Sequence, residues 1–190
     1  MAEPSPIRSV RFLPGDNQLV TASSGGSIRR WSITDGKLQS SFPAHVGDVW
    51  SAEPSPDGLS LLTTGDDGLV KRWDLASGQL LQVFSGARGP VYDARWLNDG
   101  GRVLLTGADR RVIVLDAPSW RIQAVLAGHS DGVRTIAVSL DGRTAVSAGF
   151  DRSLRVWDLE SLEDRWLSLR GHVGAVQAVA SGASKPWVAT

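Results

Sequence analysis

Cysteine is absent from this chain of 190 residues, which excludes disulfide bonds, thiol catalysis and thiolate metal sites. An excess of either charge is also absent, because 20 Lys and Arg residues balance 20 Asp and Glu residues. A neutral chain has no general attraction for nucleic acid or an anionic membrane, so we expect neither as a partner. The chain contains no apolar run of membrane-spanning length and no secretion signal in its first residues. We therefore expect an intracellular, cytoplasmic protein, and a hydrophobic content of 42% is sufficient for a globular core.

What the chain does contain is a repeat. One set of markers recurs at a step of 42 residues (73 − 31, 115 − 73 and 157 − 115), namely Trp31, Trp73, Leu115 and Trp157. A second set keeps this step until its last member, which arrives one residue late because of an insertion within residues 160–170: His45, Ala87, His129 and His172. Turn dipeptides follow in register at Pro14-Gly15, Asp57-Gly58, Asp99-Gly100 and Asp141-Gly142. The chain is therefore built from copies of one unit.

Each copy has the pattern of four short strands. In the second copy, alternating apolar residues and Asp-Gly or Ser-Gly turns predict strands at 49–53, 59–63, 69–75 and 79–84. Four antiparallel strands of this length form one small twisted sheet. Such a sheet cannot bury both of its faces alone, so the copies are expected to stack face to face.

The copies resemble the WD-repeat β-propeller family. The resemblance rests on the period, the Ser/Thr-rich second strands, Gly128-His129 with Trp157-Asp158, and His45 with Trp73-Asp74. It implies an all-β fold: an incomplete β-propeller, an open arc of four-stranded antiparallel WD-type blades. Residues 1–190 would form a single propeller region of about four and a half blades, at approximately 4–42, 43–84, 85–126 and 127–169, with a partial blade at 170–190.

The sequence stops inside the second strand of its last copy. Propellers of this family commonly close with about seven blades, so we expect either a fragment of a longer protein or closure by association with another copy. An isolated arc would leave apolar residues such as Phe12 and Val188 near a surface, which favours self-association.

The resemblance also implies a buried hydrogen-bonded network in each blade, from a His through a hydroxyl to a Trp, with an Asp beside the His. Two copies carry the full set at identical spacing: His45, Thr63, Asp67 and Trp73, then His129, Ser147, Asp151 and Trp157. Other copies depart from it. The third copy has Ala87, Leu105 and Leu115 and keeps only Asp109; the first has Thr21 and Trp31 but Glu3 and Gly25; the last has His172 and ends at Thr190, its hydroxyl place.

No catalytic, metal or cofactor site is expected. Each histidine occupies the same repeat position in a different copy, so the three cannot converge on one ion, and each Asp is explained by its own turn and histidine. The glycine-rich segment at 24–27 lacks the Lys and helix of a phosphate-binding loop. We therefore predict that the chain is not an enzyme.

Five tryptophans lie outside the motif. Trp96 occupies a first-strand core position, whereas Trp120 and Trp166 belong to the rim, as edge cover or a lateral contact. Trp50 and Tyr92 share a position that holds Arg or Gln in other copies, so they are either partner contacts or packing between blades.

The resemblance places partners on the narrow face of the propeller. The corresponding residues are Val46, Asp48 and Asp66; Arg88, Pro90 and Ala108; Ser130, Gly132 and Phe150; and Val173 and Ala175. Phe150 is the strongest candidate, because a lone aromatic before an acidic turn is expected to face solvent; Arg88 beside Tyr92 is the second. The alternative is an exposed Phe of no consequence.

The function expected from this pattern is a non-catalytic scaffold that presents a propeller face to a protein or peptide partner. The alternative is a sensory or regulatory WD-repeat region of a larger protein, attached for example to a kinase or protease domain.

Overall fold

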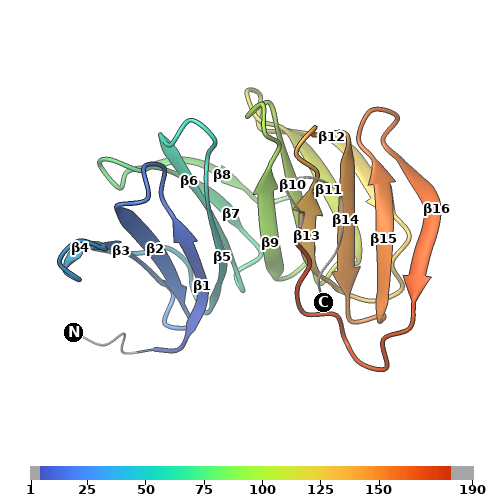
Figure 1. The fold of residues 1–190 in the computed structure, drawn as a ribbon, viewed down its shortest axis with the longest axis horizontal. Coiled ribbons are helices and arrows are strands. Elements are labelled where there is room, and N and C mark those ends of the chain that lie inside the picture. Colours follow the sequence, from blue (N-terminus) through green and yellow to red (C-terminus); the bar gives the residue numbers. More distant parts are fainter. Residues whose placement is uncertain (1–4, 181–190) are drawn as a thin grey trace. The chain divides into compact units, whose positions relative to one another are not determined.

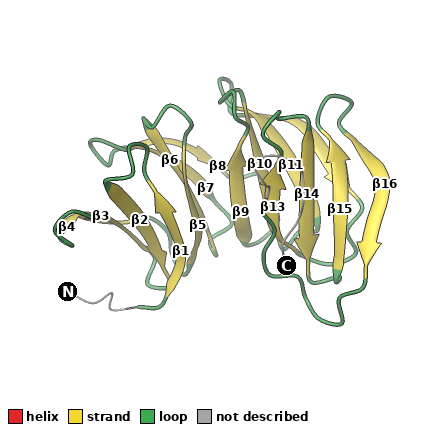
Figure 2. Ribbon diagram, viewed as in Figure 1, coloured by secondary structure: helices red, strands yellow, loops and turns green. Residues whose placement is uncertain are grey.

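A computed structural model describes residues 5–180, with the backbone alone for residues 165–170. This part of the chain forms sixteen β-strands and no helix (Figure 2). In chain order the strands are β1 (Ile7–Phe12), β2 (Gln18–Ser23), β3 (Ser27–Ser32), β4 (Leu38–Pro43), β5 (Val49–Pro54), β6 (Ser60–Gly65), β7 (Val70–Asp74), β8 (Leu80–Phe84), β9 (Val91–Trp96), β10 (Arg102–Gly107), β11 (Arg111–Asp116), β12 (Arg121–Ala127), β13 (Val133–Val138), β14 (Thr144–Gly149), β15 (Ser153–Asp158) and β16 (Glu163–Arg170). No helix of the described range is long and apolar enough to cross a membrane.

The strands form four antiparallel sheets of four strands each, in which sequential strands are hydrogen-bonded neighbours (Figure 1). We call them blades 1 to 4: β1–β4, β5–β8, β9–β12 and β13–β16. The predicted all-β fold of four-stranded antiparallel blades is confirmed, and the strands of the second copy fall within two residues of their predicted bounds. Alternating apolar residues and tight turns dictate this meander locally.

The chain divides into two compact units, residues 1–91 and residues 92–190. The N-terminal unit contains blades 1 and 2, whose facing sides bury Val20, Ile28, Val49, Ala52, Leu61 and Trp73. The C-terminal unit contains blades 3 and 4, whose facing sides bury Leu104, Val112, Val114, Ile136, Ala145 and Trp157. Stacking two sheets removes from water the apolar face that a single sheet would expose.

Polar contacts also join the blades within each unit. In the N-terminal unit, Arg11 of β1 donates to Glu53 of β5 at 3.0 Å. In the C-terminal unit, Asp93 of β9 accepts from the Thr135 hydroxyl at 3.0 Å and from the backbone N–H of Ile136 at 3.2 Å. Asp93 is only 5% exposed, so these bonds satisfy a carboxylate that would otherwise be costly to bury.

Three of the first strands contain an irregularity near their start. The pairing register shifts across Arg8 in β1, Trp50 in β5 and Arg134 in β13. A β-bulge re-aims the side chain of its extra residue. The side chains of Arg8, Trp50 and Arg134, which occupy one repeat position, therefore point differently from those of a regular strand.

The N-terminal end of the described range agrees with the expectation for an open arc, whereas the C-terminal end differs from it. Phe12 is 63% exposed, although Trp96 at the equivalent position is 7% exposed, because no described sheet of its unit covers Phe12. Residues 171–180 form no strand, although Val176 and Val179 pack on blade 4. Within residues 5–180 this segment has no paired neighbour to form a ladder with, so the predicted partial blade is not formed there; its remainder, with Val188, lies outside the described residues.

Candidate functional site

Blade 2 brings together its four predicted network residues. Nδ1 of His45 lies 2.8 Å from Oδ1 of Asp67, and Nε2 lies 2.8 Å from Oγ1 of Thr63. The indole N–H of Trp73 donates to the same hydroxyl oxygen at 2.9 Å. Because a carboxylate only accepts, His45 carries its proton on Nδ1, and Thr63 donates to Nε2 while it accepts from Trp73. Each polar side-chain group of this network therefore has a hydrogen-bond partner.

The protonation states follow from burial. Burial lowers the pKa of His45 from its ordinary value of 6.5, and the hydrogen bond to Asp67 offsets this effect only in part. Burial alone would raise the pKa of Asp67, but hydrogen bonds from His45 and from backbone N–H groups outweigh it, and this pKa is lowered from 3.8. A neutral imidazole beside an ionised carboxylate is the stable state at neutral pH.

Blade 4 repeats the arrangement. His129 contacts Oδ2 of Asp151 at 2.8 Å and Oγ of Ser147 at 2.7 Å, and Trp157 donates to Ser147 at 2.8 Å. The Ser147 and Trp157 residues are 0% and 1% exposed. Burial lowers the pKa of His129 as well. Each imidazole forms its hydrogen bonds within its own blade, and both imidazole side chains are 0% exposed.

The remaining blades show what replaces the network. In blade 1, Trp31 donates to Thr21 at 3.0 Å. In blade 3, Leu105 and Leu115 are 1% and 0% exposed, so apolar packing occupies the place of the hydroxyl and the indole. Asp109 of blade 3 binds the guanidinium of Arg111 at 2.6 Å instead of a histidine. Replacing both members of a buried polar pair by apolar groups avoids an unsatisfied atom.

The remaining residues of the predicted networks are placed as follows. His172 is exposed, and Glu3 and Thr190 lie outside the described residues. Among residues 5–180, no three His, Cys, Asp or Glu side chains form a group that could hold a metal ion.

At the loop end of the N-terminal unit, three predicted face residues lie together. Trp50 donates to Oδ1 of Asp66 at 2.6 Å, and the backbone N–H of Asp48 donates to Oδ2 of Asp66 at 3.1 Å. Arg8 of blade 1 lies 4.8 Å from the centre of the Trp50 ring and pairs with Asp48 at 2.6 Å. Trp50 is half-buried, so here the aromatic packs between blades as well as lining the face.

The loop end of the C-terminal unit is more apolar. Phe150 is 38% exposed and meets Tyr92 edge-on, with ring centres 5.8 Å apart and planes at 85°. Arg134 lies 5.8 Å from the centre of the Tyr92 ring. Phe150 was expected to stand alone in solvent, but Tyr92 of the neighbouring blade packs against it edge-on.

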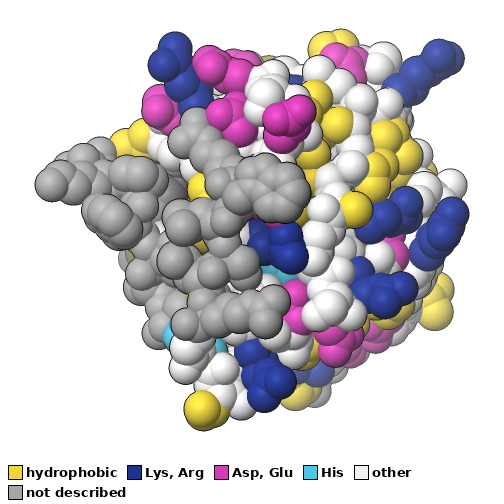
Figure 3. Space-filling view, turned by 90° about the vertical axis from the view of Figure 1, so that its right-hand side faces the viewer, with side chains coloured by type: hydrophobic (Ala, Val, Ile, Leu, Met, Phe, Trp, Pro, Cys, Tyr) yellow, Lys and Arg dark blue, Asp and Glu magenta, His cyan; other side chains and the backbone are white. Residues whose placement is uncertain are grey.

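The other residues of the predicted face are placed as follows. Ser130 is exposed, and its backbone N–H donates to Asp151 at 3.0 Å. Arg88 is exposed and belongs to the N-terminal unit, whereas Tyr92 belongs to the C-terminal unit, so their pairing stays a prediction. On the face shown in Figure 3, basic, acidic and apolar side chains are interspersed.

The tryptophans outside the motif have separate positions. Trp96 is 7% exposed, as expected of a core residue. Trp120 is half-buried and has a positive φ of 58°. The side chains of Trp166 and Trp187 lie outside the described part of the chain.

Sequence reasoning missed Asp93. Its place in the other copies holds Ser9, Ser51 and Thr135, so a carboxylate among small hydroxyl residues was the available signal. Asp93 lies 3.3 Å from Arg95 of its own strand and accepts a hydrogen bond from Thr135 of blade 4. The second of these contacts links blades 3 and 4.

These features define a class of protein: a repeat protein of stacked four-stranded blades, two of which carry a hydrogen-bonded network of His, Asp, hydroxyl and Trp side chains. A family model described as WD domain, G-beta repeat, matches residues 2–32, 36–74, 78–116 and 120–158. The chain belongs to this WD-repeat family. A comparison with curated proteins finds no match.

Proposed function

We propose that the chain is a non-catalytic scaffold that binds a protein or peptide partner through the loop ends of its blades. WD repeats generally mediate protein–protein interactions and are typically non-catalytic, which supports the coarse part of this proposal. The more specific part of the proposal is which surface of the chain binds the partner.

The observation that carries it is the aromatic group at the loop end of the C-terminal unit. Phe150 keeps 38% of its surface exposed while Tyr92 packs against it edge-on, and Arg134 in turn lies over the Tyr92 ring. Aromatic and Arg side chains dominate the binding energy of protein interfaces, and a ring already held by a neighbour loses little entropy on binding. By contrast, the loop end of the N-terminal unit offers the acidic side chains of Asp48 and Asp66 beside Trp50. The two ends therefore present different chemistry to a partner.

The test is a peptide selection from a displayed library against the full chain, followed by titration of the selected peptides. Phe150→Ala should weaken their binding by roughly tenfold or more. Leu140→Ala is the matched control, because Leu140 is 62% exposed but lies in the turn between β13 and β14, at the opposite end of the same blade. Selected peptides that bind Phe150→Ala as tightly as the original chain would overturn the proposed surface.

A further inference from the structure

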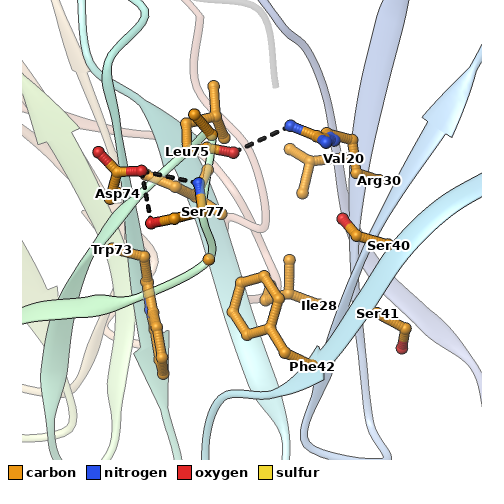
Figure 4. Close-up of a pocket in the computed structure, with 13 residues that line it drawn as sticks. Val20, Ile28, Arg30, Ser40, Ser41, Phe42, Trp73, Asp74, Leu75 and Ser77 are labelled. Atoms are coloured by element: carbon orange, nitrogen blue, oxygen red, sulfur yellow. Dashed lines mark hydrogen bonds between the residues drawn. The ribbon is translucent and has the colours of Figure 1, made fainter.

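A groove opens at the rim of the N-terminal unit, between blades 1 and 2. It encloses about 160 Å³, and its apolar lining comes from Val20, Ile28, Phe42, Leu61 and Trp73 (Figure 4). The rings of Phe42 and Trp73 lie 4.9 Å apart and tilt by 48°. A cavity of about 150 Å³ with such a lining accepts a group of the size of benzene. The groove is therefore large enough for one apolar side chain.

The C-terminal unit shows what fills this place. Residues 36, 78, 120 and 162 occupy one turn position, and all have positive φ. In blade 4 this residue is Leu162, which packs on the core cluster between blades 3 and 4. In blade 2 it is Gly78, and a Cβ built there would meet the Phe42 ring at 3.8 Å. A side chain at 78 would thus enter the groove, and the groove is open because the residue there is glycine.

The groove also has a charged end. Arg30 lines it and donates through Nη1 to the carbonyl oxygen of Leu75 at 2.9 Å, while its Nε is buried without a hydrogen-bond partner (Figure 4). The aligned residue of the C-terminal unit is Val114. The Asp74 carboxylate is held by the N–H and the hydroxyl of Ser77, both at 2.7 Å, and forms no ion pair with Arg30. A guanidinium charge at the edge of an apolar cavity favours a carboxylate in the ligand.

We propose that this groove is a docking site for a partner peptide that inserts a leucine side chain and places the carboxylate of a neighbouring acidic residue at Arg30. The leucine is inferred from Leu162, which fills the counterpart groove from within the chain. The acidic neighbour is inferred from the charge that Arg30 adds and Val114 lacks. The site lies at the rim, so it is separate from the loop ends that carry the proposed function.

The probe is a short glycine–serine peptide with a central Leu-Asp pair, titrated into the full chain while the indole N–H signal of Trp73 is followed by NMR. Replacing the leucine of the probe by alanine should weaken binding by roughly tenfold or more, because most of the buried apolar surface is lost. Replacing its aspartate by asparagine should weaken binding by a smaller factor. A probe whose binding is indifferent to both changes would overturn the proposal.

Three variants locate the binding site. Gly78→Leu should close the groove and abolish binding, whereas the control Gly36→Leu should not, because it introduces the same side chain at a positive φ where a Cβ meets nothing within 4 Å. Arg30→Val should remove the preference for aspartate over asparagine in the probe. Unchanged binding to Gly78→Leu, or equal loss in both glycine variants, would overturn the proposal.

A gain of binding provides an independent test. Leu162→Gly should open the counterpart groove in the C-terminal unit, which then takes the leucine peptide without a preference for aspartate. In the Gly78→Leu background this second groove is the one left to bind the probe. No recovery of binding in the double variant, with a folded chain by circular dichroism, would contradict the role assigned to leucine.

Discussion

The N-terminal and C-terminal units are each built from two stacked four-stranded blades, but the space between the two blades differs at the rim. In the C-terminal unit Leu162 and Val114 complete an apolar core, whereas in the N-terminal unit Gly78 and Arg30 leave a groove with a charged end. Both turn residues have positive φ, 59° for Leu162 and 72° for Gly78. Because leucine is disfavoured in this conformation, its burial must offset a strain that glycine does not have. The comparison shows that one repeat position holds a side chain packed on the core in one unit and a glycine beside an open groove in the other.

The largest difference between the units is expected at the motif tryptophans. Trp157→Ala should lower the free energy of unfolding by about 3–5 kcal/mol, because it leaves a closed cavity and removes a hydrogen-bond donor from Ser147. Trp73→Ala should cost less, because Trp73 borders the open groove. Denaturant unfolding measures both. If the two variants lost the same free energy of unfolding, the open groove would have no effect on the cost of the cavity. The expected difference between the two units would then be wrong.

The apolar blade provides the next test. Leu115→Ala should cost about 2–5 kcal/mol through its cavity alone, because Leu115 is 0% exposed and no polar group depends on it. The loss should be the same at pH 7.5 and pH 5.5, roughly the two sides of the histidine titration. A loss that changes with pH would show that blade 3 is coupled to a titrating network.

The two networks should make stability depend on pH. The pKa values of His45 and His129 are lowered in the folded chain from 6.5, so the unfolded chain binds more protons below that pH. Stability is therefore full above about pH 6.5 and falls as the pH drops toward the folded values, by at most about 1.4 kcal/mol per pH unit for each histidine. His129→Gln should remove its share of this slope. If the melting temperature did not change as the pH was lowered below about 6.5, the assignment of His45 and His129 as buried neutral side chains would be wrong.

The smallest effect is expected at the loop ends. Arg8→Ala should cost about 0.5–1 kcal/mol, because a partly exposed ion pair and a cation–π contact contribute little in water. Arg134→Ala removes the equivalent cation from Tyr92 in the other unit, where the separation is 5.8 Å rather than 4.8 Å, and should cost no more. Thermal denaturation compares them. A large loss in either variant would mean that the loop ends hold the blades together and are not mainly binding surfaces.

The blades could be predicted from the sequence pattern, and their networks from its resemblance to WD repeats. In each full network the hydroxyl follows the histidine by 18 residues (63 − 45 and 147 − 129), and the bonding side chains belong to one sheet whose register the turns fix. The same periodicity identified Leu105 and Leu115 as apolar replacements, and both are buried. Contacts inside one blade follow from local spacing because a hairpin brings defined positions together.

Contacts between blades were harder to predict. Phe150 was expected to be alone, but Tyr92 of the neighbouring blade packs against it. The tie from Asp93 to Thr135 was missed, although the two residues are one period apart. Such contacts depend on how closely two sheets approach and on where a bulge aims a side chain, and neither is encoded by spacing within one copy.

The sequence by itself determined the repeat and the four-stranded blades, because these arise from short-range spacing, and its resemblance to WD repeats implied the two complete His–Asp networks, which satisfy buried polar groups. Only the tertiary structure decided that a groove opens at the rim of the N-terminal unit, that Leu162 packs on the core between blades 3 and 4, and that an aromatic pair lines the loop end of those two blades. The physical reason is that these features belong to the space between two stacked sheets, whose filling depends on side chains contributed by both.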